Sequence, residues 1–315
     1  QLGRGSFIPV AMVQIILTGP TASGKGSVAF ELAKRMEASI ACMDSMKIYR
    51  EMDIVTAKPP QERRDRCQYH LIDLIEPEDS FSVGRYLPLL EGLLESETAA
   101  GRPLVISGGT GLYLKGFLDG LVQGPGANWE LRDRLTAEAR ESGSASLYAR
   151  LQEVDPVAAA KLLPSNERRI IRALEFFESS GQPLGDSWEW KGSTRPREDT
   201  VLFGLGWERE ALYARANERV LAMVEQGLFA ECEGLLSRQP PPGRSASQCI
   251  GLREIREGLE AGASRGAIIE TIQKNTRNFI KRQLTWFRKM DVEWLPVGGE
   301  LEPASVAEAI LARLT

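Results

Sequence analysis

The most constraining feature of this chain is a glycine-rich segment at residues 19–25, with the sequence GPTASGK. It follows the apolar run 13–17 and precedes a stretch in which Val28, Leu32 and Met36 recur at helical spacing. A loop of this kind, between a strand and a helix, directs backbone N–H groups and the helix N-terminus at phosphate oxygens, and its lysine adds a full positive charge. The sequence therefore predicts a phosphate-binding loop in an α/β fold.

One position in this loop departs from the usual pattern. The residue after the lysine is ordinarily Ser or Thr, whose hydroxyl contacts Mg²⁺, but this chain has Gly26. The neighbouring hydroxyl of Ser27 is the candidate metal ligand in its place. We therefore predict binding of a di- or triphosphate in a manner that differs from an ordinary nucleotide hydrolase.

Composition excludes several classes of protein. The 315 residues include four cysteines, which are far apart, and one histidine, which argues against zinc sites, a disulfide framework and multi-histidine metal sites. No apolar run approaches the roughly 18 residues of a membrane helix, and no signal-peptide pattern is present, so we expect a cytoplasmic protein without a membrane partner. The net charge of −4 argues against general coating of nucleic acid, but it allows a specific RNA site with local basic patches.

Strands and helices are expected to alternate along the first part of the chain. The predicted strands lie near residues 13–17, 39–43, 69–75, 103–107 and 201–205. This order predicts an α/β fold with a P-loop NTPase-like parallel sheet core flanked by helices. Ligands bind such sheets at the carboxyl ends of strands, where the turns 19–25, 44–45 and 108–111 fall.

The pattern changes after Gly120 and becomes helical from about 128 to 180. We predict a tail over residues 1–12, a core formed by 13–121 and 199–315, and an all-helical insertion domain over 122–198. Long helices are expected around 208–237 and 247–291.

The residues alone leave several roles open. Asp44 suits a general base, a metal ligand or a helix cap. The turn at 108–111 is either a tight strand-to-helix connection or a second anion contact through Thr110, and His70 is interpreted as structural. Two clusters of basic residues recur at helical spacing. The first is Arg168, Arg169 and Arg172, and the second is Arg277, Lys281, Arg282 and Arg288. Spacing by itself indicates that both lie on solvent-exposed helix faces, although the aromatic residues within the second cluster would suit RNA binding.

Taken in order, several stretches resemble the tRNA dimethylallyltransferases, also called tRNA isopentenyltransferases. They are residues 19–25, 44–59, 70–73, 80–83, 108–113, 168–175, 248–254 and 281–288, and the resemblance covers about 13 to 295. Residues 44–59 and 281–288 are the most specific. This family transfers a dimethylallyl group from dimethylallyl diphosphate to N6 of the adenosine 3′ of the anticodon, and the resemblance implies that activity.

The resemblance also implies roles for individual residues. Asp44 would take the proton of the amine, while Lys25, Thr110 and Mg²⁺ would stabilise the departing diphosphate. The implied diphosphate site comprises Gly19, Pro20, Thr21, Ala22, Ser23, Gly24, Lys25 and Gly26.

The implied RNA partner is the anticodon stem-loop of tRNA, gripped by the helical insertion of a monomeric enzyme. The implied contacts are Asp44, Ser45, Met46, Lys47, Thr110, Arg132, Arg168, Arg169, Ile170, Ile171, Arg172, Gln248, Cys249, Ile250, Gly251, Leu252 and Arg253. The chain departs from the family pattern at Lys47, where Gln is common, and at Leu252, where Tyr is common. It also departs at Val55, where Gly is common, and at Tyr69, which replaces the first of a frequent histidine pair.

Two other classes of function compete with this prediction. The first is another phosphate-loop enzyme, such as an adenylate isopentenyltransferase or a small-molecule kinase, but a small acceptor needs neither an arginine-bearing insertion nor a basic C-terminal helix. The second is an inactive RNA-binding relative, against which the presence of Asp44, Lys25 and Thr110 argues.

Overall fold

The computed structural model describes residues 14–120, 124–185 and 200–314. The chain divides into two compact units, Gln1–Leu118 with Thr194–Thr315, and Asp119–Ser193. The tail predicted over 1–12 and the predicted domain boundaries at 121–122 and 198–199 lie outside the described residues.

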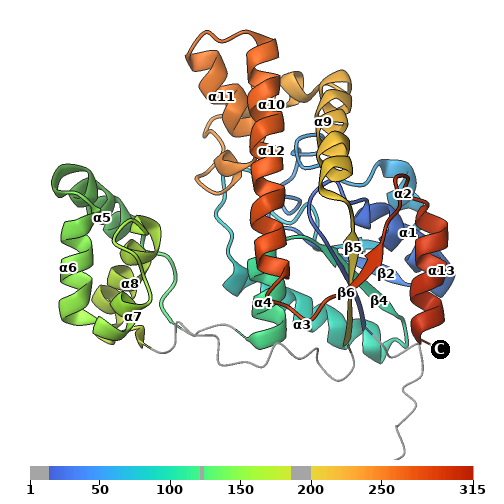
Figure 1. Cartoon of the computed structure of the whole chain (residues 1–315), viewed down its shortest axis with the longest axis horizontal. Helices are drawn as coiled ribbons and strands as arrows, with labels where there is room; N and C mark the ends of the chain where they lie inside the picture. The colour runs from blue at the N-terminus through green and yellow to red at the C-terminus, as the bar shows by residue number, and fades with distance from the viewer. Residues whose placement is uncertain (1–13, 121–123, 186–199, 315) are drawn as a thin grey trace, which may run out of the picture. The chain divides into compact units, whose positions relative to one another are not determined.

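The larger unit is built on a parallel sheet (Figure 1). Its strands are β1 (Gln14–Thr18), β2 (Ser39–Met43), β3 (Tyr69–His70), β4 (Leu104–Gly108), β5 (Thr200–Gly206) and β6 (Glu293–Pro296). They pair in the order β3-β2-β4-β1-β5-β6, and every pairing is parallel. The predicted α/β fold with a parallel sheet is confirmed.

Helices cover both faces of this sheet (Figure 1). Side chains alternate between the faces, so that Ile15 and Leu17 of β1 enter one core and Ile16 enters the other. The first core is closed by α1 (Lys25–Met36) and α13 (Pro303–Leu314). The second is closed by α3 (Val83–Ala99), α4 (Gly111–Asp119) and the end of α12 (Arg265–Phe287).

A further hydrophobic cluster joins the loop after β2 to four helices. It contains Ile48, Met52 and Val55 from the loop and buried side chains of α9 (Arg209–Glu225), α10 (Leu228–Leu236), α11 (Leu252–Glu260) and α12. A short 3-10 helix, η3 (Ala246–Gln248), contributes Ala246. Another short helix, α2 (Gln61–Arg66), precedes β3.

Some predicted elements differ from the observed ones. The helix expected over 208–237 is wrong as one element, because Gly227 has φ 103° and separates α9 from α10. The helix expected over 247–291 is likewise two helices, since Ser264 caps a new one through its bond from Ala267 N–H at 3.3 Å. The strand expected over 69–75 ends after His70, where Leu71 and Asp73 adopt positive φ.

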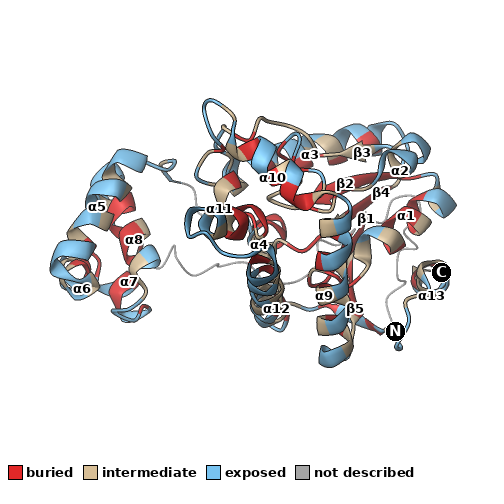
Figure 2. Ribbon diagram, turned by 90° about the horizontal axis from the view of Figure 1, so that it is seen from above, coloured by how far each residue is buried: buried red, intermediate tan, exposed pale blue. Residues whose placement is uncertain are grey.

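The smaller unit is helical throughout its described residues. It contains α5 (Trp129–Ser142), α6 (Ser144–Val154), α7 (Pro156–Ala160) and α8 (Glu167–Ser180). Figure 2 shows buried residues on these helices, which include Leu135, Leu147, Leu151 and Leu174. Asn128 and Asp155 cap α5 and α7 by accepting backbone N–H bonds. Across the described parts of both units, no helix has the length and apolar character needed to cross a membrane.

Candidate active site

The phosphate loop connects β1 to α1 in a strained, glycine-dependent path. Gly24 precedes the helix with φ 87°, and a Cβ on it would lie 2.1 Å from Leu301 Cδ2, so no other residue fits there without displacement. Ala22 also adopts a positive φ, 64°. The backbone is thereby turned into the shape that directs N–H groups at an anion.

Distant segments hold this loop in place. Gln283 of α12 accepts a bond from Thr21 N–H at 2.8 Å and donates from Nε2 to the Gly109 carbonyl at 2.9 Å. The indole Nε1 of Trp207 donates to the Ser23 carbonyl at 2.9 Å. Gly109 approaches so closely that a Cβ on it would lie 2.8 Å from the Gly19 carbonyl. The turns after β1 and β4 are therefore one rigid assembly.

A cavity of about 200 Å³ opens beside the loop. Of the predicted diphosphate residues, five line it, namely Thr21, Ala22, Gly24, Lys25 and Gly26, whereas Gly19, Pro20 and Ser23 do not. The remaining lining residues are Ser27, Ala29, Ile40, Cys42, Asp44, Lys47, Thr56, Ala57, Lys58, Pro59, Pro60, Arg63, Tyr69, Ser107, Gly108 and Arg219. Among these described residues Asp44 is the one acidic side chain, so the cavity suits an anion.

Lys25 and Arg219, both partly exposed, supply positive charge to the cavity. Burial lowers the pKa of Lys25 to about 7, against the opposing effect of Asp44, and its Nζ donates to the Pro20 carbonyl at 3.3 Å. Arg219 of α9 donates to Thr21 Oγ1 at 3.0 Å. Sequence reasoning missed Arg219, because no local motif marks a residue that reaches the loop only through the packing of α9.

Asp44 and Thr110 shape the turn after β2. Asp44 Oδ1 accepts the N–H of Met46 at 2.9 Å, and Thr110 Oγ1 accepts the N–H of Ser45 at 3.1 Å. Thr110 therefore contacts the turn that carries Asp44 but does not line the cavity. Among the described residues, no helix begins directly after Asp44, so its carboxylate stabilises a turn and does not cap a helix, and its position on the cavity wall leaves the role of base open to it.

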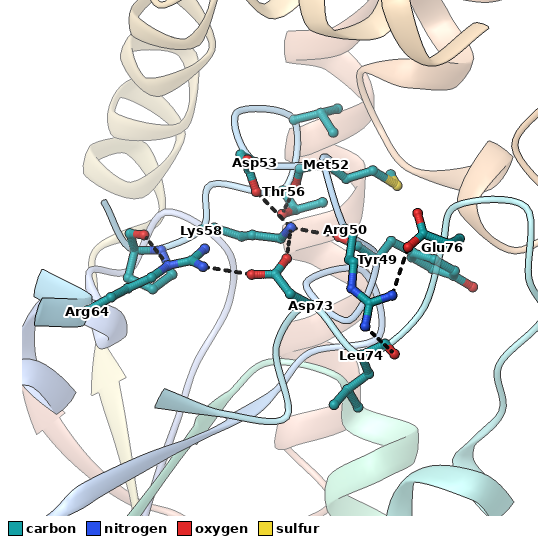
Figure 3. Close-up of polar contacts among 12 residues, drawn as sticks. Tyr49, Arg50, Met52, Asp53, Thr56, Lys58, Arg64, Asp73, Leu74 and Glu76 are labelled. Atoms are coloured by element: carbon teal, nitrogen blue, oxygen red, sulfur yellow. Dashed lines mark hydrogen bonds and ion pairs between the residues drawn. The ribbon is translucent and has the colours of Figure 1, made fainter. Parts of the chain in front are cut away.

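Lys58 fixes the loop that follows (Figure 3). Its buried Nζ donates to the Tyr49 carbonyl at 2.6 Å, to Asp53 Oδ1 at 2.8 Å and to Asp73 in a shorter contact. Arg64 pairs with the other oxygen of Asp73 at 2.6 Å. All N–H groups of Lys58 are thus committed, so it positions the cavity wall and is not free to bind phosphate.

The residues at the expected Mg²⁺ position do not fit a metal held by the protein. Gly26 offers no side-chain oxygen, and the hydroxyl of Ser27 accepts a bond from the cationic Arg63 Nη1 at 3.1 Å, which would repel a metal ion. Among the described residues, no group of three or more His, Cys, Asp or Glu is arranged to hold a metal.

The RNA residues expected at 248–253 belong to the larger unit. Gln248 is exposed and Arg253 is partly exposed, with a short ion pair to the buried Glu254. Cys249, Gly251 and Leu252 are buried, so their contribution to this surface is packing. His70 does not line the cavity, and its buried Nε2 has no hydrogen-bond partner.

The arginines expected in the smaller unit have two different environments. Arg132 forms a two-pronged pair with the fully buried Glu175, both bonds at 2.9 Å, and Arg172 joins the same carboxylate at 2.6 Å. These two arginines anchor the helices. Arg168 and Arg169 are exposed, whereas Ile170 and Ile171, which separate them from Arg172 in the sequence, are core residues.

Comparison with known proteins identifies the family. The profile of the IPP transferase family matches residues 47–290. The chain belongs to the IPP transferase family. The resemblance predicted from the sequence is thereby confirmed.

Individual relatives of the IPP transferase family extend over nearly the whole chain. A tRNA dimethylallyltransferase of Geobacter metallireducens is 40% identical over 289 residues, which is 91% of this chain and 94% of the relative. One from Acetivibrio thermocellus is 38% identical over 283 residues, 89% of this chain and 90% of the relative. A tRNA isopentenylpyrophosphate transferase structure from Bacillus halodurans has a TM-score of 0.68 at 35% identity, covering 96% of this chain and 97% of that chain.

Proposed function

We propose that the protein transfers a dimethylallyl group from dimethylallyl diphosphate to N6 of the adenosine 3′ of the anticodon in tRNA, with release of diphosphate. The observation that carries this proposal is that Asp44, Lys25 and Arg219 line the same cavity. Asp44 opposes the effect of burial on the pKa of both Lys25 and Arg219, so a proton acceptor lies beside the anion-binding groups.

In the proposed reaction, the bond between N6 and the allylic carbon forms as the bond from that carbon to the diphosphate oxygen breaks. The leaving diphosphate keeps the electron pair of the broken bond. The proton of N6 passes to the carboxylate of Asp44, which lies on the cavity wall. Because an exocyclic amine is a weak nucleophile, this proton acceptor is needed as the new bond forms.

The phosphate loop would stabilise the charge that develops on the leaving group. Its backbone N–H groups, Lys25 and Arg219 are fixed before the substrate arrives, since Gln283 and Trp207 hold the loop from outside. Thr110 would act through the turn of Asp44, to which it is bonded. Any Mg²⁺ that binds with the donor would be held by diphosphate oxygens and water, because the Ser27 hydroxyl accepts a hydrogen bond from Arg63.

The acceptor would be the anticodon stem-loop. Exposed Gln248 of the larger unit and exposed Arg168 and Arg169 of the smaller unit are the side chains we propose for RNA contact. The positive charges of the two arginines suit phosphates, the neutral amide of Gln248 can donate or accept hydrogen bonds, and the target adenine would leave its stack to reach the cavity. We propose that the protein acts as a monomer in the cytoplasm.

One assay tests this function. Purified protein is incubated with dimethylallyl diphosphate, Mg²⁺ and an unmodified tRNA transcript, and nucleosides are analysed by mass spectrometry. We expect one adenosine to gain the prenyl mass, and an anticodon stem-loop without that adenosine to stay unmodified. Prenylation of free adenosine monophosphate in place of tRNA would support the adenylate isopentenyltransferase alternative. ATP-dependent phosphorylation of a metabolite would support the kinase alternative.

A further inference from the structure

Arg63 lies next to the position where the phosphate loop lacks its usual hydroxyl. It belongs to α2 and lines the cavity together with Gly26 and Ser27. Its Nη1 donates to Ser27 Oγ at 3.1 Å. Its guanidinium carbon is 5.3 Å from the ring centre of Phe30, a buried residue of α1. The guanidinium is thus within cation–π distance of the Phe30 ring while it lines the cavity.

The charge around the cavity is strongly one-sided. Lys25, Lys47, Arg63 and Arg219 line it as cations, and Asp44 is the one acid among the described lining residues. Lys58 adds nothing to this excess, because Asp53 and Asp73 accept its bonds. A diphosphate carries several negative charges, and these side chains can neutralise much of them without a metal ion.

We propose that Arg63 binds the diphosphate of the prenyl donor and supplies positive charge that a hydroxyl-held Mg²⁺ gives in loops with Ser or Thr after the lysine. The proposal rests on the proposed function, because it takes diphosphate as the cavity's ligand. A guanidinium offers five N–H donors in a planar fork, so the bond to Ser27 leaves donors for phosphate oxygens. The positive charge of Arg63 then compensates for the hydroxyl that Gly26 lacks.

The test is calorimetric binding of inorganic pyrophosphate to the full chain, with Mg²⁺ and again with EDTA. Arg63→Gln is compared with Arg66→Gln as the matched control. Arg66 is on the same helix and its guanidinium carbon is 5.6 Å from the same ring, but it does not line the cavity. In EDTA we expect Arg63→Gln to weaken binding about tenfold or more, as for loss of a charged hydrogen bond, and Arg66→Gln to leave it near the wild-type value.

A second variant restores the hydroxyl at position 26 in a protein that lacks Arg63. A side chain at position 26 meets no atom within 4 Å of its Cβ, so Gly26→Thr can supply the missing hydroxyl. Added to Arg63→Gln, it should restore pyrophosphate binding in Mg²⁺ but not in EDTA. Thermal unfolding of each variant checks that the fold is retained.

The outcomes separate this proposal from the proposed function. If Arg63→Gln and Arg66→Gln bind pyrophosphate equally in EDTA while wild type binds normally, the role of Arg63 is overturned and the diphosphate site stands. If wild type binds no pyrophosphate with or without Mg²⁺, the diphosphate site itself is overturned, and with it both proposals.

Discussion

At the scale of single residues, Asp44 combines a chemical and a structural role. One carboxylate oxygen accepts the Met46 N–H, and an asparagine can keep that bond through its amide oxygen. Asp44→Asn should therefore keep the turn but lose the proton acceptor, which lowers the single-turnover rate by about 10²- to 10⁴-fold. The Kd for tRNA should change little. Rapid-quench kinetics and a filter-binding titration measure the two effects, and a near-normal rate would remove Asp44 as the base.

Lys25 gives the site a pH dependence of a definite sign. Because burial lowers its pKa to about 7, the free protein loses this charge as pH rises above 7, and a bound anion must restore it. We expect pyrophosphate affinity to fall between about pH 7 and pH 9, with net proton uptake on binding.

Calorimetry in buffers of different ionisation enthalpy measures that uptake. Lys25→Arg is the control, because its guanidinium stays charged throughout this range. Protons taken up by pyrophosphate itself are common to both proteins. Equal uptake by wild type and Lys25→Arg would contradict the prediction.

At the scale of elements, the loop between β2 and α2 depends on Lys58. Burial alone would raise the pKa of Asp73, but its bonds from Lys58 and Arg64 lower it below its ordinary value. Lys58→Met leaves this carboxylate without its closest partner, so we expect a loss of roughly 2–3 kcal/mol in the free energy of unfolding at pH 7, less than for a fully buried pair. Chemical denaturation measures it.

The pair of Lys58 and Asp73 also predicts how the loss in the free energy of unfolding varies with pH. A carboxylate with a lowered pKa stabilises the fold above its unfolded pKa of about 4, and that contribution is lost as pH falls through the lowered value. The difference between wild type and Lys58→Met should shrink below about pH 4. Arg50→Gln is the matched control, since its pair with Glu76 is about half exposed and should contribute below about 1 kcal/mol. A constant difference across the pH range would refute the role of Asp73.

Sequence patterns predicted those elements whose signal is local. The apolar runs of β1, β2, β4 and β5 lie within a residue or so of their expected positions, because buried parallel strands are continuously apolar. β6 reads Glu-Trp-Leu-Pro, with three of its four residues exposed, so it carried no such signal. The break at Gly227 depends on a left-handed conformation within an otherwise helical pattern.

The residues of the site also divide into those with a local sequence signal and those without one. The loop at 19–25 and Asp44 follow strands directly and were predicted from that local context. Arg219 and Arg63 line the cavity and Gln283 bonds the phosphate loop, all three from helices whose packing no short window of sequence records. The separation between Thr21 and Gln283 is 262 positions.

At the scale of the whole molecule, RNA affinity should depend on exposed charge in the smaller unit. Arg168 and Arg169 are exposed on α8, and replacing both by glutamine should weaken tRNA binding and reduce its dependence on salt. Each lost phosphate contact lowers the slope of log K against log salt by about 0.7–0.9, so we expect a decrease of roughly 1.4–1.8. Fluorescence anisotropy over a salt series measures it.

The control for this prediction is Arg134→Gln, because Arg134 of α5 is already paired with Glu178. It should leave the salt slope nearly unchanged. An unaltered slope in the double variant would place the RNA contacts elsewhere.

The supports of the phosphate loop have a consequence for biosynthesis. The loop is translated early, but two of its hydrogen bonds need residues that are translated much later. The Ser23 carbonyl accepts its bond from Trp207, 184 positions along the chain, and the Thr21 N–H donates to Gln283. Leu301, which packs against Gly24, is made later still. A growing chain on the ribosome therefore contains the phosphate-loop sequence long before the residues that stabilise the loop's conformation have been made. We expect the loop to bind diphosphate only after Trp207, Gln283 and Leu301 have left the ribosome and packed against it.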